Sequence, residues 1–222
     1  MNGDWLGLIV DSFWKILLPG LTVTIPLTAI SFFFALIIAT VMALVQYAKV
    51  PAAKDFARFY IWVIRGTPLL VQLFVVFYGL PHVGILINPF LAAVIVFSIN
   101  EGAYAAETVR AALESVPKGQ LEAGLCAGLT YMQTFRRIIL PQALRTAFPT
   151  LANGLISMVK DTSLAANITV TEMFMVTQRI VARTYEPLVL YIEVGLVYLL
   201  FCTVLTRVQS WGEKKLGAHG YD

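Results

Sequence analysis

A carboxylate inside an apolar stretch is the feature of this sequence most able to do chemistry. Glu101 lies about twelve residues into an apolar run that begins near Pro89. A helix of about 20 residues can span a membrane, and an ionisable group inside a span costs roughly 2.5–3.5 kcal/mol on insertion scales, so it is a functional candidate. On a helix, Tyr104 and Thr108 share its face. This stripe could bind an ammonium group; alternatively, Glu101 pairs with a polar group of a neighbouring helix.

A second polar group interrupts a later apolar stretch. Asp161 follows Lys160, and Thr162 and Ser163 come next. Such a group is expected to interrupt a membrane helix, and freed backbone is tolerated only where it lines protein or a cavity. Asp161 is therefore a second candidate for an ammonium group, and Thr162 and Ser163 could hold a carboxylate at a new helix start. Lys160 is either a counter-ion for Asp161 or a ligand.

Three other charged groups in apolar surroundings are expected to have structural roles. Glu107 and Arg110 are three residues apart, so they can pair on the surface of one helix. Glu193 could pair with Arg179 or Arg183.

The sequence Arg-Gly-Thr-Pro at residues 65–68 interrupts another apolar segment. Pro68 removes a backbone donor and Gly66 loosens the helix. The functional interpretation is a hinge that moves between states. The alternative is a static kink, with the Arg65 side chain extending to the lipid headgroups.

The composition is that of a polytopic membrane protein. Hydrophobic residues make up 59% of the 222 residues and charged residues only 13%, with a mean hydropathy of +0.78. Soluble domains are about 45–50% apolar and about 25% charged. The net charge of +3 gives no indication of a nucleic-acid partner. Cys126, Cys202, His82 and His219 match no metal or redox spacing, so neither a metal site nor a membrane enzyme is expected.

The apolar segments predict an all-α fold with five transmembrane helices in a single domain, residues 1–222. The expected spans are residues 17–45, 56–80, 89–113, 147–166 and 188–206, and residues 115–146 form a loop between the third and fourth. The longer connection after the fourth span is expected to hold a short helix that does not cross the membrane, starting near Glu172 and running to Val181.

Lysine and arginine predict the orientation of the spans. The connections on one side hold most of these residues: Lys49, Lys54, Arg58, Lys118, Arg136, Arg137, Arg145, Arg207, Lys214 and Lys215. Because cytoplasmic connections are enriched in Lys and Arg, the N-terminus is expected outside and the 115–146 loop and the C-terminus in the cytoplasm.

The 115–146 loop carries the most specific pattern of the chain. Its fixed positions are Glu122, Ala123, Gly124, Gly128 and Pro141. Gly128 can take positive φ and end a first short helix. Thr130 can cap a second helix, which Pro141 is expected to stop. Two short helices joined by a glycine turn would form a compact knob.

This stretch resembles the EAA motif of bacterial ABC-importer permeases, the cytoplasmic coupling-helix loop that docks on the ATPase subunit. Every spacing of that motif is met, and the one departure is Gly124, where the family has a second alanine. The resemblance implies that Glu122 faces a basic or dipolar feature of the ATPase. The implied docking residues are Glu122, Ala123, Gly124, Gly128, Arg136 and Pro141.

Residues 58–74, 103–110 and 160–164 are similar to one branch of these permeases, which takes up polar amino acids (histidine, glutamate, glutamine, arginine and cystine types). Residues 183–188 and 100–104 look most like permeases for cystine and related sulfur amino acids. The resemblance implies a type I ABC-importer permease fold in the bacterial inner membrane. It implies two ATPase subunits, a second permease subunit that is either identical or a sister chain, an extracytoplasmic solute-binding protein and contact with membrane lipid. The ammonium group above would then belong to the amino acid.

Two other transport functions are alternatives. One is a proton-coupled secondary transporter with Glu101, Glu107 or Asp161 as the proton carrier. Such folds usually have inverted repeats, and no repeat is evident here. The other is an ABC permease for another small polar solute. The chain has no Gly-x-x-x-x-Gly-Lys-[Ser/Thr] phosphate loop, so ATP and Mg²⁺ are expected on a partner and no cofactor on this chain.

Overall fold

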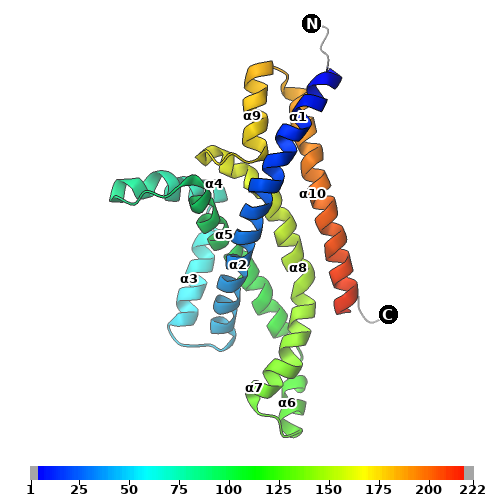
Figure 1. Ribbon diagram of the computed structural model, residues 1–222. Coiled ribbons are helices and arrows are strands. Elements are labelled where there is room, and N and C mark those ends of the chain that lie inside the picture. The colour runs from blue at the N-terminus through cyan, green and yellow to red at the C-terminus, as the bar shows by residue number, and fades with distance from the viewer. Residues whose placement is uncertain (1–4, 218–222) are drawn as a thin grey trace. The chain divides into compact units, whose positions relative to one another are not determined.

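The computed structural model describes residues 5–217, and every regular element in that range is a helix (Figure 1). The α-helices are α1 (Trp5–Pro19), α2 (Ile25–Tyr47), α3 (Ala53–Arg65), α4 (Leu69–Phe74), α5 (Pro89–Ser115), α6 (Lys118–Cys126), α7 (Tyr131–Thr134), α8 (Leu140–Asp161), α9 (Met173–Thr184) and α10 (Pro187–Leu216). Wider π turns occupy Gly20–Thr24, Val75–Gly79 and Phe135–Ile139, and 3₁₀ segments occupy Leu80–Val83 and Thr162–Ile168.

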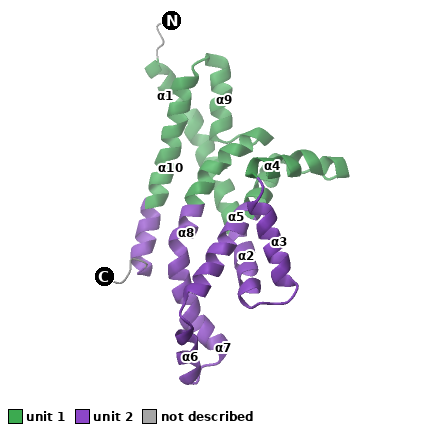
Figure 2. Ribbon diagram, turned by 180° about the vertical axis from the view of Figure 1, so that it is seen from behind, with its two compact units in different colours: residues 1–33, 68–98, 155–206 green, residues 34–67, 99–154, 207–222 purple. Residues whose placement is uncertain are grey.

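The chain divides into two compact units (Figure 2). Unit 1 consists of residues 1–33, 68–98 and 155–206. Unit 2 consists of residues 34–67, 99–154 and 207–222. Each unit has its own apolar core, so each is described separately.

Unit 1 is built around large side chains. Phe97 and Ile168 belong to one buried cluster, and Ile16, Val159 and Met173 belong to another. Gly20 packs closely against this second cluster, because a Cβ added there would be 2.6 Å from the Met173 sulfur. A side chain larger than hydrogen at residue 20 would therefore disturb the core of this unit.

Unit 2 uses small side chains to bring its helices together. Ala39 of α2 and Ala103 and Ala106 of α5 are fully buried beside Ile61 of α3. Small residues let helix backbones approach closely, which is the usual way that helices associate in membranes. The Tyr60 hydroxyl also donates a hydrogen bond to the backbone carbonyl of Ile99, which joins α3 to α5.

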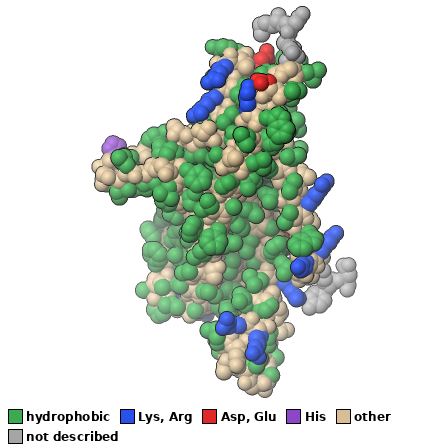
Figure 3. Space-filling model, viewed as in Figure 1, with side chains coloured by type: hydrophobic (Ala, Val, Ile, Leu, Met, Phe, Trp, Pro, Cys, Tyr) green, Lys and Arg blue, Asp and Glu red, His purple; other side chains and the backbone are tan. Residues whose placement is uncertain are grey.

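Three helical segments of the described chain are long and apolar enough to cross a membrane: Trp5–Tyr47, Pro89–Ser115 and Pro187–Leu216. A fourth is added if α3 and the helical run Leu69–Val83 count as one broken span. Hydrophobic side chains cover much of the face seen in Figure 3. Exposed apolar surface of this extent is what a protein surrounded by lipid requires.

Two expected spans differ from these helices. The predicted interruption of the span 56–80 at residues 65–68 is confirmed, because α3 ends at Arg65 and Pro68, with extended backbone (φ −64°, ψ 136°), precedes a new helical run. The expected span 147–166 is made by the second half of α8 and by a 3₁₀ segment from Thr162. The predicted interruption after Asp161 is therefore confirmed as a change of helix type.

The short helix after the fourth expected span is confirmed as α9. Glu172 caps it, since its carboxylate accepts hydrogen bonds from the backbone N–H groups of Phe174 (2.8 Å) and Met175 (2.6 Å). This satisfies two of the N–H groups that a helix start leaves without partners.

Candidate functional sites

The predicted glycine turn joins α6 to α7 in unit 2. Gly128 has a φ of +80°, and the N–H groups of Leu129 and Gly128 donate to the carbonyls of Gly124 (3.1 Å) and Leu125 (3.0 Å). This is the pairing of a Schellman motif, which closes a helix C-terminus. Both the glycine and its role are confirmed.

The start of α7 is fixed by a capping box. The Gln133 N–H donates to the Thr130 hydroxyl (3.3 Å), and the Thr130 N–H donates to the Gln133 side-chain oxygen (2.9 Å). Such reciprocal bonds hold the backbone at a helix start. We call helices α6 and α7, together with the π turn Phe135–Ile139 that continues α7, the α6–α7 knob.

The expectation that Pro141 ends the second helix is wrong. The helix continues from Tyr131 through the π turn Phe135–Ile139 into α8, with Pro141 in the first turn of α8. Proline lacks an N–H, and its ring clashes with the carbonyl four residues earlier. A π turn, whose bonds run from residue i to i+5, accommodates this defect without ending the helix.

Gly124 is the point of closest packing inside the α6–α7 knob. It is buried, and a Cβ added there would overlap the Thr134 side chain, which is itself fully buried. Glycine stands at position 124, where the motif has alanine, and the Thr134 side chain of α7 occupies the space that an alanine methyl group would need. No feature of the local sequence indicates this pairing.

We therefore expect Gly124→Ala, which restores the motif, to destabilise the knob by about 1–3 kcal/mol through overpacking. Thr134→Ala should recover most of that loss in the double variant, because it removes the overlapping atoms. Thermal unfolding of the wild type, the two single variants and the double variant in detergent measures the coupling energy between residues 124 and 134. Additive effects of the two substitutions would contradict the packing described.

The α6–α7 knob is anchored on the rest of unit 2 by apolar contacts. Ile139 is buried with Ala112 and Leu113 of α5, and Leu121 and Phe135 pack against the same cluster. The knob is therefore joined to the ends of longer helices by packed side chains, which can transmit a push.

The outer surface of the knob combines charged and apolar side chains. Glu122, Ala123 and Arg136 are exposed. Three large side chains that the sequence did not single out for docking are also about half exposed: Leu125 (47%), Tyr131 (52%) and Met132 (59%). Exposed apolar residues on a polar loop are typical of a protein interface.

Glu101 lies on α5 against α8 in unit 2. A Cβ added at Gly154 of α8 would overlap the Glu101 carboxylate, so the absence of a side chain at Gly154 makes room for the acid. Tyr104 is 44% exposed, and the Arg65 guanidinium lies 5.2 Å from the centre of its ring. Thr108 donates to the Tyr104 carbonyl (3.3 Å). Glu101, Tyr104 and Thr108, the residues of the expected stripe, therefore each contact a different neighbour.

The predicted pair of Glu107 and Arg110 is confirmed and extended. Arg110 lies 2.9 Å from the Glu107 carboxylate and 2.6 Å from that of Glu114. All three residues are on α5, so the arrangement follows from helical spacing. The third member, Glu114, was not predicted.

The polar group of residues 160–163 lies in unit 1. Asp161 is partly buried and accepts a hydrogen bond from Ser157. The hydroxyl groups of Thr162 and Ser163 donate to the carbonyls of Val159 (2.7 Å) and Lys160 (2.8 Å). Those two donors, expected to hold a carboxylate, are thus engaged within the helix.

A groove of about 420 Å³ lies beside this group in unit 1, and its lining is mostly apolar. Lys160 and Ser163 line it together with the stacked rings of Phe174 and Tyr191, whose centres are 5.8 Å apart. The residues that line it are Lys160, Ser163, Phe174, Tyr191, Val194, Gly195 and Tyr198.

Two buried carboxylates of unit 1 have partners that the sequence did not predict. Tyr198 donates to Glu172 (2.9 Å), and burial raises the pKa of the Glu172 carboxyl above its ordinary value. Glu193 accepts a hydrogen bond from Ser12 (2.6 Å), not from Arg179 or Arg183 as expected. Neither contact follows from local spacing, since Tyr198 is 26 residues from Glu172 and Ser12 is 181 residues from Glu193.

The Arg65–Pro68 segment separates the two units along the chain, since the boundary falls between Thr67 and Pro68. Gly66 ends α3, and a Cβ there would be 2.9 Å from the Trp62 carbonyl oxygen. Hinges are usually formed by a few residues at the ends of such elements. The assignment of Arg65, Gly66 and Pro68 to a hinge therefore stays a prediction.

The fold and the α6–α7 knob define a permease of a transport system. Residues 35–217 match the family described as binding-protein-dependent transport system inner membrane component, and the chain belongs to this family. This family consists of membrane subunits of transport systems.

Individual relatives match along nearly the whole chain. The L-cystine transport system permease protein TcyB of Bacillus subtilis (strain 168) is 48% identical over 210 residues, covering 94% of this chain and 90% of the relative. The L-cystine transport system permease protein TcyL of the same organism is 40% identical over 215 residues, covering 94% and 90%. A crystal structure of an amino acid ABC transporter with histidines has a TM-score of 0.88 and 31% identity, covering 97% of this chain and all of that one.

Proposed function

We propose that this chain is the permease subunit of an ATP-driven importer that moves a polar L-amino acid, with cystine or a related sulfur amino acid favoured, across the cytoplasmic membrane. The single observation that carries the proposal is the α6–α7 knob, an anchored pair of short helices with an exposed charged and apolar surface. Membership of the family and the two similar cystine permeases support the amino-acid assignment.

An ATP-driven importer of this kind needs several partner proteins. Two ATPase subunits, which bind ATP and Mg²⁺, dock on the knobs of two permease subunits, which are either identical or sister chains. An extracytoplasmic solute-binding protein delivers the amino acid. The membrane protein has five spans in one permease domain, with the N-terminus outside and the C-terminus in the cytoplasm. The basic residues of the α2–α3 connection and of the 118–145 region support that orientation.

Nucleotide drives transport by shifting an equilibrium between two conformations. Closure of the ATPases around ATP pulls on the knobs, and the permease opens outward; hydrolysis resets it. The anchoring of the knob through Leu121, Phe135 and Ile139 supports this transmission. The segment Gly66–Pro68, which connects α3 to α4, is the proposed hinge, because a short connection between helices can absorb a change in backbone angles.

The substrate contacts are proposed at two separate places. In unit 2, Glu101 is the proposed acceptor for the α-ammonium group, with Tyr104 and Thr108 nearby on α5. In unit 1, Asp161 is the corresponding acceptor. Because the Thr162 and Ser163 hydroxyls are engaged, their contribution to binding the carboxylate requires that these bonds rearrange.

Uptake into liposomes tests the proposal. The permease, its co-purifying ATPase and a binding protein are reconstituted, and labelled amino acids are supplied with and without ATP. We expect ATP-dependent accumulation of cystine or another polar amino acid. Uptake that ignores ATP but collapses with the proton gradient would favour the secondary transporter. ATP-driven uptake of a solute other than an amino acid would retain the importer and reject the substrate.

A further inference from the structure

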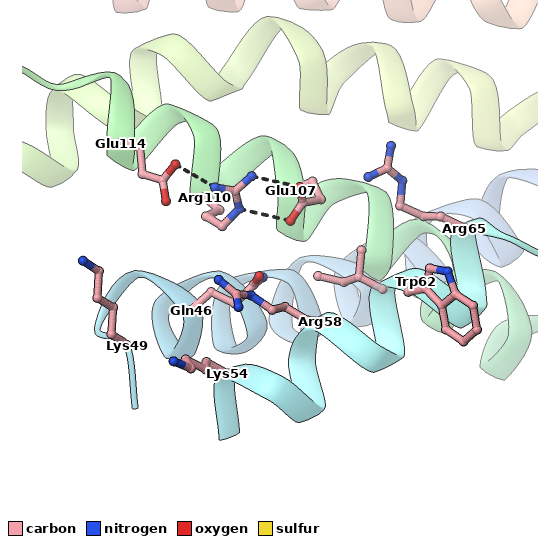
Figure 4. A pocket seen from close by; sticks show the side chains of 10 residues that line it. Gln46, Lys49, Lys54, Arg58, Trp62, Arg65, Glu107, Arg110 and Glu114 are labelled. Atoms are coloured by element: carbon pink, nitrogen blue, oxygen red, sulfur yellow. Dashed lines mark hydrogen bonds and ion pairs between the residues drawn. The ribbon is translucent and has the colours of Figure 1, made fainter. Parts of the chain in front are cut away.

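A cavity of about 650 Å³ in unit 2 lies apart from the α6–α7 knob and from the proposed substrate contacts (Figure 4). It lies between the end of α2, the α2–α3 connection, α3 and α5. Its lining residues are Gln46, Lys49, Lys54, Arg58, Ile61, Trp62, Arg65, Glu107, Arg110 and Glu114. Five of these ten are basic and two are acidic, so the cavity is strongly cationic.

The two acids of the cavity both pair with Arg110, and the lining keeps more positive than negative charge. Arg110 is held between Glu107 and Glu114, as the dashed lines of Figure 4 show. Lys49 and Lys54 form no ion pair within residues 5–217. The remaining positive charge is available to an anion.

The other two cations of the lining are held only weakly by the protein. Arg58 reaches Asp55 at 3.9 Å, with both side chains about two-thirds exposed, and such a pair is weak. Arg65 lies over the Tyr104 ring, which leaves its guanidinium without a carboxylate partner among the ion pairs of the described chain.

Helix α3 places an apolar stripe beside this basic lining. Phe56, Phe59 and Trp62 follow one another at i, i+3 and i+6, and they are 62%, 61% and 71% exposed. On the opposite face of the same helix, Ala57 and Ile61 are buried in the core. A helix with adjacent basic and exposed aromatic stripes suits the boundary between lipid headgroups and acyl chains.

The connection that carries Lys49 is held in an unusual backbone conformation. Lys49 and Ala52 have φ values of 53° and 60°, a region that residues other than glycine rarely adopt. The segment joins the apolar helix α2 to the amphipathic helix α3, which suits a position at a membrane surface. Strained backbone of this kind clusters at functional sites.

We propose that this cavity binds the phosphate of an anionic phospholipid headgroup. Lys49, Lys54 and Arg58 contact the phosphate oxygens, because guanidinium and ammonium groups bind phosphate through charge-assisted hydrogen bonds. The acyl chains lie along the stripe of Phe56, Phe59 and Trp62. Basic pockets between membrane helices are known to suit such headgroups. Free phosphate shares the charge chemistry but would not use the aromatic stripe.

Native mass spectrometry of the full chain tests this proposal. The protein in neutral detergent is titrated with phosphatidylglycerol or with phosphatidylcholine of the same acyl chains, and retained lipid is counted. Lys54→Gln/Arg58→Gln should weaken phosphatidylglycerol binding about 25-fold, at roughly fivefold per cation, and leave phosphatidylcholine unchanged. Lys49→Gln, at an exposed position in the connection, should weaken it about fivefold if the double variant fails to fold.

The matched control is Arg179→Gln/Arg183→Gln on α9, which makes the same change in net charge in unit 1. It should leave phosphatidylglycerol binding intact. Equal loss in this control would mean attraction by net charge and would overturn the site, as would unchanged binding in the Lys54/Arg58 variant. Saturable binding of inorganic phosphate that depends on Lys54 and Arg58, without preference for the anionic lipid, would assign the cavity to free phosphate and overturn the lipid proposal.

Discussion

Glu122→Arg is expected to reduce ATP-driven uptake about tenfold or more while the chain still folds and inserts. Glu122 is exposed on α6, so the substitution does not disturb the core of the α6–α7 knob. Arginine also favours helix as strongly as glutamate does. At a docking surface, reversing a charge that faces a basic or dipolar partner costs several kcal/mol, which weakens coupling by at least a factor of ten.

The measurement is uptake and ATP hydrolysis by the same reconstituted vesicles. We expect hydrolysis that no longer drives accumulation. Asp11→Arg is the matched control, because it reverses an exposed carboxylate on α1, where only a surface ion pair with Lys15 is lost. Full uptake by Glu122→Arg would reject the docking assignment, whatever the control does.

Glu101→Gln and Asp161→Asn should each abolish most uptake while the ATPase still assembles with the permease. A hydrogen bond from a charged group contributes about 1.5–3 kcal/mol. Its loss lowers affinity for the ammonium group roughly 10- to 150-fold. The amide keeps the shape of each side chain, so the Glu101 contact with Gly154 is preserved and the effect reports the charge.

The measurement is the concentration dependence of uptake for each variant. Glu193→Gln is the matched control, because it neutralises a carboxylate elsewhere in the helices, which is buried and has Ser12 as its partner. Unchanged uptake kinetics in either test variant would remove that residue from the substrate site. Equal loss in Glu193→Gln would mean that buried carboxylates of this chain are needed for assembly and not for binding.

The sequence by itself was sufficient where a feature depends on neighbours within one helical turn. The positive φ of Gly128, the cap at Thr130, the pair of Glu107 with Arg110 and the start of α9 at Glu172 are all local. Their hydrogen bonds and ion pairs join residues two to five positions apart, so the spacing of residue types is enough to predict them. The helical class and the family follow from apolar length and from the spacing of the EAA motif.

Contacts between residues on different helices were determined only by the tertiary structure. Gly124 is matched to Thr134, Glu101 fits against Gly154, and Glu193 pairs with Ser12 instead of a nearby arginine. The continuation of the helix through Pro141 was also not predicted. The physical reason is that close packing makes each contact depend on side-chain volume and direction in another element, and these are fixed only when the helices meet.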